Sequence, residues 1–165
     1  MENKNKRTSS LVYFKSNYLP EQVWGYLIHP KYATEFTKKP CYHNEISSDF
    51  KLEKGYSWTE IHTGDDCQGD EVVCKVLKSI EYETFITVRH QTGIKNTTIF
   101  KLEKIGTGTL ISEEQKYALS LRNFKPLSLV AWIMLTTGLL IKFSFKPEDD
   151  EYWFKKMEET ITKYE

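Results

Sequence analysis

The sequence predicts an α+β domain in which an antiparallel β-sheet packs against a long C-terminal helix. Short β-prone segments separated by turn residues fill residues 41–118, with breaks about every 10–15 residues, as in an antiparallel meander. A strand-like segment and two short helical patterns precede this region, and an apolar run followed by an amphipathic pattern ends the chain. The length of 165 residues suits one domain. We expect residues 10–165 to form it and residues 1–9, which are polar and basic, to be a disordered tail.

The N-terminal part of the domain should hold one strand and two short helices. Residues 11–16 are rich in β-prone side chains and predict the first strand. Pro20 suits the first position of a helix, and an apolar stripe follows it until His29, which precedes a proline and therefore ends the helix. A second short helix is expected over residues 31–38, where Pro40 stops it.

Six further strands are expected between residues 41 and 118, which makes seven with the first. The breaks fall at turn-forming residues, namely 54–55, 64–66, 79–81, 92–93 and 106–108. Alternation is clear around residue 86, where Tyr82, Thr84, Ile86 and Val88 oppose Glu83, Thr87 and Arg89. Phe100 and Leu102 likewise oppose charged neighbours. We expect the apolar side of each strand to face the core, because side chains alternate between the two faces of a sheet.

The C-terminal part should contain two helical segments. The apolar run from Leu127 to Ile141 lies between Lys125 and Lys142, which bracket 16 residues, at or below the roughly 17–25 that cross a bilayer. We expect a buried helix, with contact to a membrane surface or a dimer interface as the alternatives. A proline at position 147, followed by three acidic residues and an apolar stripe, predicts an amphipathic last helix on the concave face of the sheet.

Composition argues against several classes of function. The 23 basic residues balance the 23 acidic residues and are spread along the chain, so no nucleic-acid partner is expected. Cys41, Cys67 and Cys74 form no Cys-x-x-Cys pair and are expected to be free thiols in a reducing compartment. The N-terminus carries no signal-peptide pattern, so a cytoplasmic location is expected. The sequence shows no metal-ligand spacing and no cofactor fingerprint, so none is predicted.

The order of strand, two helices, six strands and C-terminal helices resembles that of the START-like (SRPBCC) superfamily. Its members include polyketide cyclase/dehydrase-like and birch-pollen-allergen-like proteins. The resemblance covers nearly the whole chain and is carried by residues 19–24 at the first helix, 55–60 at a strand start and 106–109 between the last two strands. It implies a helix-grip fold, in which a seven-stranded antiparallel sheet curls around the long C-terminal helix and a deep cavity between them holds an apolar ligand.

Three residues are candidates for acid–base chemistry. Glu60 and His62 share one strand face with Trp58, and a carboxylate near an imidazole in a dry pocket could move a proton. A solvated pair beside a turn is the alternative. His90 continues the apolar face of its strand and could orient a ligand by one hydrogen bond, or be a satisfied core histidine.

The leading functional hypothesis is a protein that binds a small hydrophobic ligand, lipid or polyketide-like. The residues expected at the ligand are Trp24, Trp58, Ile86, Val88, His90, Phe100, Tyr117, Trp153 and Met157. One alternative is a polyketide cyclase/dehydratase-like enzyme, and another is a protein that associates with a membrane surface through residues 127–141. A binding protein is favoured, because the sequence contains no nucleophile elbow, phosphate loop or dinucleotide motif. A monomer or a homodimer is expected.

Overall fold

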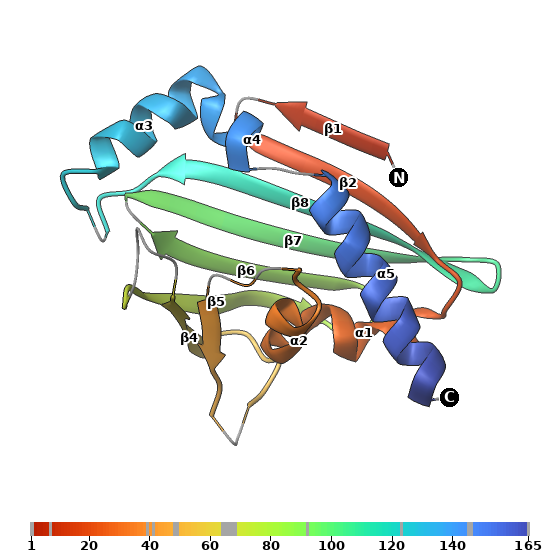
Figure 1. Cartoon of the computed structure of the whole chain (residues 1–165). Helices are drawn as coiled ribbons and strands as arrows, with labels where there is room; N and C mark the ends of the chain where they lie inside the picture. Colours follow the sequence, from red (N-terminus) through yellow and green to blue (C-terminus); the bar gives the residue numbers. More distant parts are fainter. Residues whose placement is uncertain are drawn as a thin grey trace.

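A computed structural model describes residues 2–6, 8–38, 40, 42–47, 50–63, 69–91, 93–122, 124–144 and 147–164. Within these ranges, eight strands form one antiparallel sheet in the order β1-β2-β8-β7-β6-β5-β4-β3, crossed by a long C-terminal helix (Figure 1). The strands are β1 Glu2–Lys6, β2 Ser9–Ser16, β3 Tyr42–Glu45, β4 Ser57–His62, β5 Glu71–Ile80, β6 Thr84–Gln91, β7 Ile94–Ile105 and β8 Gly108–Leu119. The helices are α1 Pro20–Ile28, α2 Pro30–Glu35, α3 Ser128–Thr137, α4 Leu139–Ser144 and α5 Pro147–Tyr164.

The expected meander is confirmed, because β3 to β8 follow one another both along the chain and across the sheet. The first of the seven expected strands, β2, returns to pair with the last, β8. The eighth strand, β1, lies where the sequence suggested a disordered tail and pairs with β2 instead. An edge strand forms backbone hydrogen bonds to one neighbouring strand only and can be polar on both faces. The polar residues 2–6 therefore lack the apolar alternation from which a strand is predicted.

Helices α1 and α2 connect β2, which lies next to the edge strand β1, with β3, which forms the opposite edge of the sheet. Pro20 occupies the first turn of α1, and the Gln22 side chain accepts a hydrogen bond from the Leu19 backbone N–H at 2.8 Å. His29 ends α1 and caps α2, where its Nδ1 accepts a hydrogen bond from the backbone N–H of Lys31 at 3.2 Å. The proline signals therefore place both ends of α1 correctly. The second helix, expected over residues 31–38, occupies Pro30–Glu35 and ends before Pro40.

The core lies between the inner face of the sheet, α1 and α5. Phe154, Met157 and Ile161 follow one another at helical spacing along α5 and are almost fully buried. They belong to one hydrophobic cluster with α1 and with inward side chains of the strands, among them Val12, Val23, Trp24, Leu27, Val76, Phe85, Leu102 and Ile111. The amphipathic pattern thus holds α5 across the sheet (Figure 1).

The apolar run does not form the single buried helix that the sequence suggested. Gly138 adopts a positive φ of 80° and ends α3, so that α4 starts as a separate helix. Only one side of α3 is covered, with Ser128 and Leu135 buried, while Leu129 and Ile133 are more than half exposed. None of the helices in the described ranges combines the length and apolarity needed to cross a bilayer.

Candidate ligand-binding cavity

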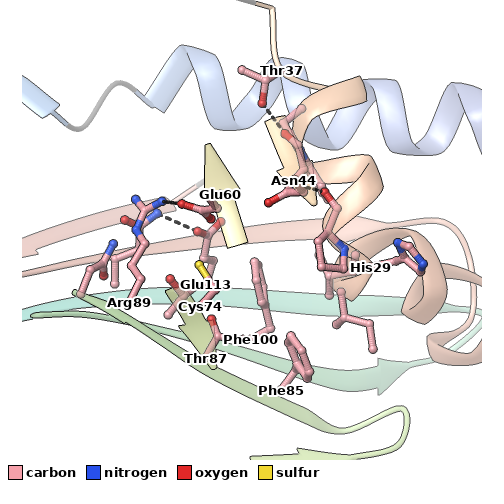
Figure 2. A pocket seen from close by; sticks show the side chains of 18 of the residues that line it. His29, Thr37, Asn44, Glu60, Cys74, Phe85, Thr87, Arg89, Phe100 and Glu113 are labelled. Carbon is pink, nitrogen blue, oxygen red and sulfur yellow. Dashed lines mark hydrogen bonds and ion pairs between the residues drawn. The ribbon is translucent and has the colours of Figure 1, made fainter. Parts of the chain in front are cut away.

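A cavity of about 690 Å³ lies between the inner face of the sheet and the helices. Its walls come from β3 to β8, from α2 and the ends of α1 and α2, and from the N-terminal turns of α5. Figure 2 shows an uneven distribution of side chains, with Arg89, Glu60 and Glu113 together at one end and Phe85 and Phe100 toward the other. The cavity therefore has a polar end and an apolar end.

The apolar walls are largely aromatic. Trp58, Phe85, Phe100, Trp153 and Phe154 all line the cavity. Two of these rings pack against each other, with Trp153 edge-on to Phe154 and 5.4 Å between the ring centroids. The indole N–H of Trp58 donates to the Asn44 side chain at 3.1 Å, which leaves the flat face of the ring as apolar surface.

An ion pair between Glu60 and Arg89 dominates the polar end. Arg89 Nη1 donates to Glu60 Oε2 at 3.0 Å, and His62 Nε2 lies 3.9 Å from the same oxygen. Burial by itself raises the pKa of Glu60 and is the largest single effect. The charge of Arg89 and smaller contributions from the His62, Cys74 and Arg89 side chains together outweigh burial and lower the pKa of Glu60 from 4.5 to about 2. Glu60 is thus a fixed carboxylate, and a poor proton donor at neutral pH.

A relay of hydrogen bonds on β8 brings a second carboxyl group into the cavity. The Tyr117 hydroxyl donates to Gln115 Oε1 at 2.6 Å, and Gln115 Nε2 donates to Glu113 Oε1 at 2.8 Å. Burial raises the pKa of Glu113, and the bond from Gln115 and the charge of Arg89 offset part of that rise. The relay fixes the orientation of this carboxyl group.

Asp150 adds a third carboxyl group from the first turns of α5. Burial, then the charges of Glu113 and Asp149, raise its pKa from 3.8 to about 8, so the group is protonated at neutral pH. Its Oδ2 is buried and has no hydrogen-bond partner among the described residues. An ionised Glu60 and a neutral Asp150 in one cavity give the site both a fixed charge and a transferable proton.

Several predicted site residues line this cavity, namely Trp58, Glu60, Phe100 and Trp153. Tyr117 stands behind them at the end of the relay, and His62 stands beside Glu60. Trp24 and Met157 lie in the core cluster, where Trp24 packs edge-on against Phe85 at 6.3 Å between ring centroids. Their contact with a ligand stays a prediction.

The expectation for β6 was wrong in its choice of face. Ile86, Val88 and His90 are absent from the cavity lining, whereas Phe85, Thr87 and Arg89 line it. Adjacent residues of a strand point to opposite faces, so the three predicted residues face away from the cavity. His90 instead contacts the Ser120 hydroxyl through Nδ1 at 2.9 Å. The alternation between the two faces of β6 was predicted correctly. The more apolar face was expected to point inward, but the face that lines the cavity carries the charged Arg89.

Sequence reasoning also missed Asp150, Asn96 and Arg89. Asp150 follows a proline at a helix start, where an acidic residue is expected for the helix dipole alone. Asn96 is 6% exposed and lines the cavity, and its Oδ1 has no hydrogen-bond partner among the described residues. A polar residue at an inward position of β7, between Ile94 and Thr98, was the available signal.

Cysteine and metal chemistry add little to the described site. Cys74 is a buried free thiol on the cavity wall, and burial followed by the charge of Glu60 raises its pKa. Cys41, Cys67 and the predicted break at residues 64–66 lie outside the described residues. Within the described ranges, no three His, Cys, Asp or Glu side chains gather as a metal ion would require. The expectation of no metal and no cofactor stays a prediction.

Comparisons with known proteins concern the fold. No protein-family model matches the sequence, and no curated protein matches it. A solved structure from Rhodobacter sphaeroides is 14% identical, with a TM-score of 0.72 over 99% of each chain. Ara h 8.0201 is 14% identical, with a TM-score of 0.59 over 94% of this chain and 97% of its own. The di-domain ARO/CYC protein StfQ from the steffimycin biosynthetic pathway is 8% identical, with a TM-score of 0.68 over 95% of this chain and 52% of its own. At these identities the likeness is one of architecture, and the chain has the START-like helix-grip fold.

Proposed function

We propose that the chain binds a small, largely apolar molecule in the cavity between the sheet and α5. The observation that carries this proposal is the cavity itself, whose volume of about 690 Å³ lies within the range typical of small-molecule sites. Burying about 200 Å² of apolar ligand surface would contribute roughly 5 kcal/mol before the costs of association. The polar end would then orient the ligand.

A bulky side chain placed in the cavity tests this proposal. Thr98 lies on β7 with its side chain in the cavity, and its neighbour Thr97 points to the opposite face. Thr98→Trp should abolish binding of an environment-sensitive fluorescent probe such as anilinonaphthalene sulfonate or a neutral analogue, while Thr97→Trp should bind like the wild type. Equal probe binding by the two variants, each checked for its fold by circular dichroism, would contradict the proposal.

Acid–base catalysis is a second candidate function. Glu113 and Asp150 support it, because one cavity holds two partly buried carboxyl groups with raised pKa values. They are better proton carriers than the sequence-based candidates Glu60, whose pKa is too low, and His90, which lies outside the cavity lining. The fold shared with the ARO/CYC protein StfQ suggests a polyketide-like substrate as the first to try.

The two candidates differ in what Asp150→Asn should do. An enzyme should lose turnover of a polyketide-like substrate while its affinity for that substrate changes little, because the amide keeps the shape of the carboxyl group but cannot donate the same proton. If the chain only binds its ligand, the wild type should already leave the substrate unconverted, so Asp150→Asn has no turnover to lose.

Cytoplasmic location and oligomeric state stay predictions from the sequence.

A further inference from the structure

More acidic than basic side chains line the cavity. Four carboxyl groups line it, those of Glu60, Glu113, Asp149 and Asp150, against the two cations Lys38 and Arg89. Arg89 Nη1 is in an ion pair with Glu60 Oε2 at 3.0 Å, and Lys38 Nζ lies 5.9 Å from the centroid of the Tyr152 ring. Among the described residues, neither Glu113 nor Asp150 is in an ion pair. Two acids therefore face the cavity outside any ion pair between described residues, although the charge of Arg89 still acts on Glu113.

Unpaired buried atoms at this end are oxygens. Asn96 Oδ1 and Asp150 Oδ2 are both buried and lack a hydrogen-bond donor among the described residues. Buried polar atoms are normally hydrogen-bonded, and each one left unpaired costs about 1–3 kcal/mol. Both side chains line the cavity, so a ligand that donates hydrogen bonds would satisfy them.

We infer that the ligand is an amphipathic molecule with a protonated amine at one end and an apolar body at the other. This inference rests on the proposed function of the cavity. The amine would lie between Glu113 and Asp150, and the apolar body along the rings of Phe85, Phe100 and Trp153, all of which line the cavity. The raised pKa values of the two acids fit this assignment. Burial raises both, and the charge of Glu113 further raises that of Asp150, and an ammonium group would favour the ionised form of each acid. A fatty acid would instead add a fifth carboxyl group to the four that already line the cavity.

Three probes of equal chain length separate the possibilities: dodecylamine, dodecanol and dodecanoate, measured by isothermal titration calorimetry below their micellar concentrations. The amine should bind roughly tenfold more tightly than the alcohol, because charge-assisted hydrogen bonds are about twice as strong as neutral ones. The acid should bind most weakly. Dodecanoate binding as tightly as dodecylamine would overturn the inference and leave the cavity function standing. Failure of all three to bind would overturn both.

Two variants and a control locate the amine. Glu113→Gln and Asp150→Asn should each reduce the affinity for dodecylamine to that for dodecanol. Glu114→Gln, one residue along β8 on the opposite face and paired with Lys116 at 3.0 Å, should change nothing. Affinity for the amine should also rise from about pH 6 to about pH 9, as Asp150 loses its proton, and binding at neutral pH should release protons to the buffer. An unchanged affinity in both variants would overturn the inference.

A separate observation concerns the outer surface of α3. Among the described residues thirteen large hydrophobic side chains are exposed, and eight of these lie between Leu119 and Leu139. Leu121 is 80% exposed, and Leu127, Leu129 and Ile133 are each exposed by 55% or more. The helix is held from behind, where the Trp132 indole donates to the Gly93 carbonyl at 2.8 Å. Monomeric proteins rarely expose so many apolar residues together.

The charges along this segment have one sign. Between residues 115 and 147 the sequence has five basic residues and no acidic one, although basic and acidic residues balance over the whole chain. Two of the five are paired with acids outside the segment, Lys116 with Glu114 at 3.0 Å and Lys125 with Asp70 at 2.7 Å. Arg122 is exposed beside the apolar residues, and with Lys95 it contributes to the lowered pKa of His90, after burial. In Figure 1, α3 stands at the edge of the molecule, away from α1 and α2.

The geometry points to an anionic lipid surface as the partner of α3. Its exposed residues would enter the headgroup region while the basic residues meet the phosphates, as amphipathic surface helices do. A second copy of the chain fits less well, because two such surfaces would bring like charges together.

Vesicle flotation tests this assignment. The chain should float with vesicles of phosphatidylcholine and phosphatidylglycerol, less with phosphatidylcholine alone, and less at high salt. The double variant Leu129→Ser/Ile133→Ser should lose binding, whereas Val73→Ser, at an exposed apolar position on β5, should keep it. Equal flotation of the double variant, no flotation of the wild type, or a stable dimer by light scattering that the double variant disrupts would each overturn the assignment.

Discussion

Removing Arg89 should destabilise the protein through the carboxylate that it leaves behind. Glu60 is 6% exposed and its pKa is lowered from 4.5 to about 2, with the charge of Arg89 as the largest of the lowering causes. A lowering of this size corresponds to roughly 3 kcal/mol of stability at neutral pH, since each pKa unit is worth about 1.4 kcal/mol. Breaking a buried pair from one side costs about 3–5 kcal/mol. The Arg89 side chain is 33% exposed, so we expect the lower end of that range for Arg89→Met.

The assay is urea denaturation followed by tryptophan fluorescence, at several pH values. A group whose pKa is lowered by folding stabilises the protein above its unfolded pKa, and that stability is lost as the pH falls toward the folded pKa. The difference in unfolding free energy between wild type and Arg89→Met should therefore shrink from about pH 5 to about pH 2.

Two further variants control this experiment. Lys101→Met removes an exposed cation from β7 and should cost less than about 0.5 kcal/mol. The double variant Glu60→Met/Arg89→Met should recover most of the loss, because no buried charge remains unpaired. An Arg89→Met variant as stable as wild type at neutral pH, or a loss of stability that does not depend on pH in this range, would refute a stabilising role for this ion pair.

Three other perturbations have defined outcomes. Burial and the charge of Glu113 raise the pKa of Asp150 to about 8, so the folded protein holds a proton that the unfolded chain has lost. Its unfolding free energy should therefore fall from about pH 4 to about pH 8, and Asp150→Asn should flatten this slope in denaturant titrations. Met157→Ala removes a fully buried side chain from α5 and should cost about 2–5 kcal/mol in the same assay, where no loss would remove Met157 from the core. Gly93 has a φ of 75°, and a Cβ added there would lie 2.6 Å from Ser128 Cβ. Gly93→Ala should therefore loosen α3 and speed its proteolysis, and an unchanged digestion rate would contradict this packing.

The elements that the sequence predicted well are those set by local chemistry. Pro20 and Pro147 mark the starts of α1 and α5, because the fixed φ of proline suits the first turn, and Pro30 marks the end of α1. Alternating β-prone residues between turn signals located β3 to β8 in the right order. Glu60 was found because a carboxyl group, an imidazole and an indole at period-2 spacing must share one face of a strand.

Features that depend on distant parts of the chain were out of reach. The face of β6 that lines the cavity carries Arg89, which forms an ion pair with Glu60 on β4. The two residues are far apart in the sequence, and no local pattern around Arg89 indicates this pairing. Ile86 and Val88 made the other face look like the core. Asp150 becomes a cavity residue only because α5 places it near Glu113 on β8. Likewise, the apolar run could not reveal that only one side of α3 would be covered.

Native mass spectrometry of the protein purified without detergent, with organic extraction of the bound material, shows whether the cavity holds a ligand. We expect one apolar molecule per chain in the wild type, its loss in Thr98→Trp and its retention in Thr97→Trp. A bound molecule that remains in Thr98→Trp would place it outside the cavity. A wild type that purifies empty and takes up none of the dodecyl probes would contradict the claim that this cavity binds an apolar ligand.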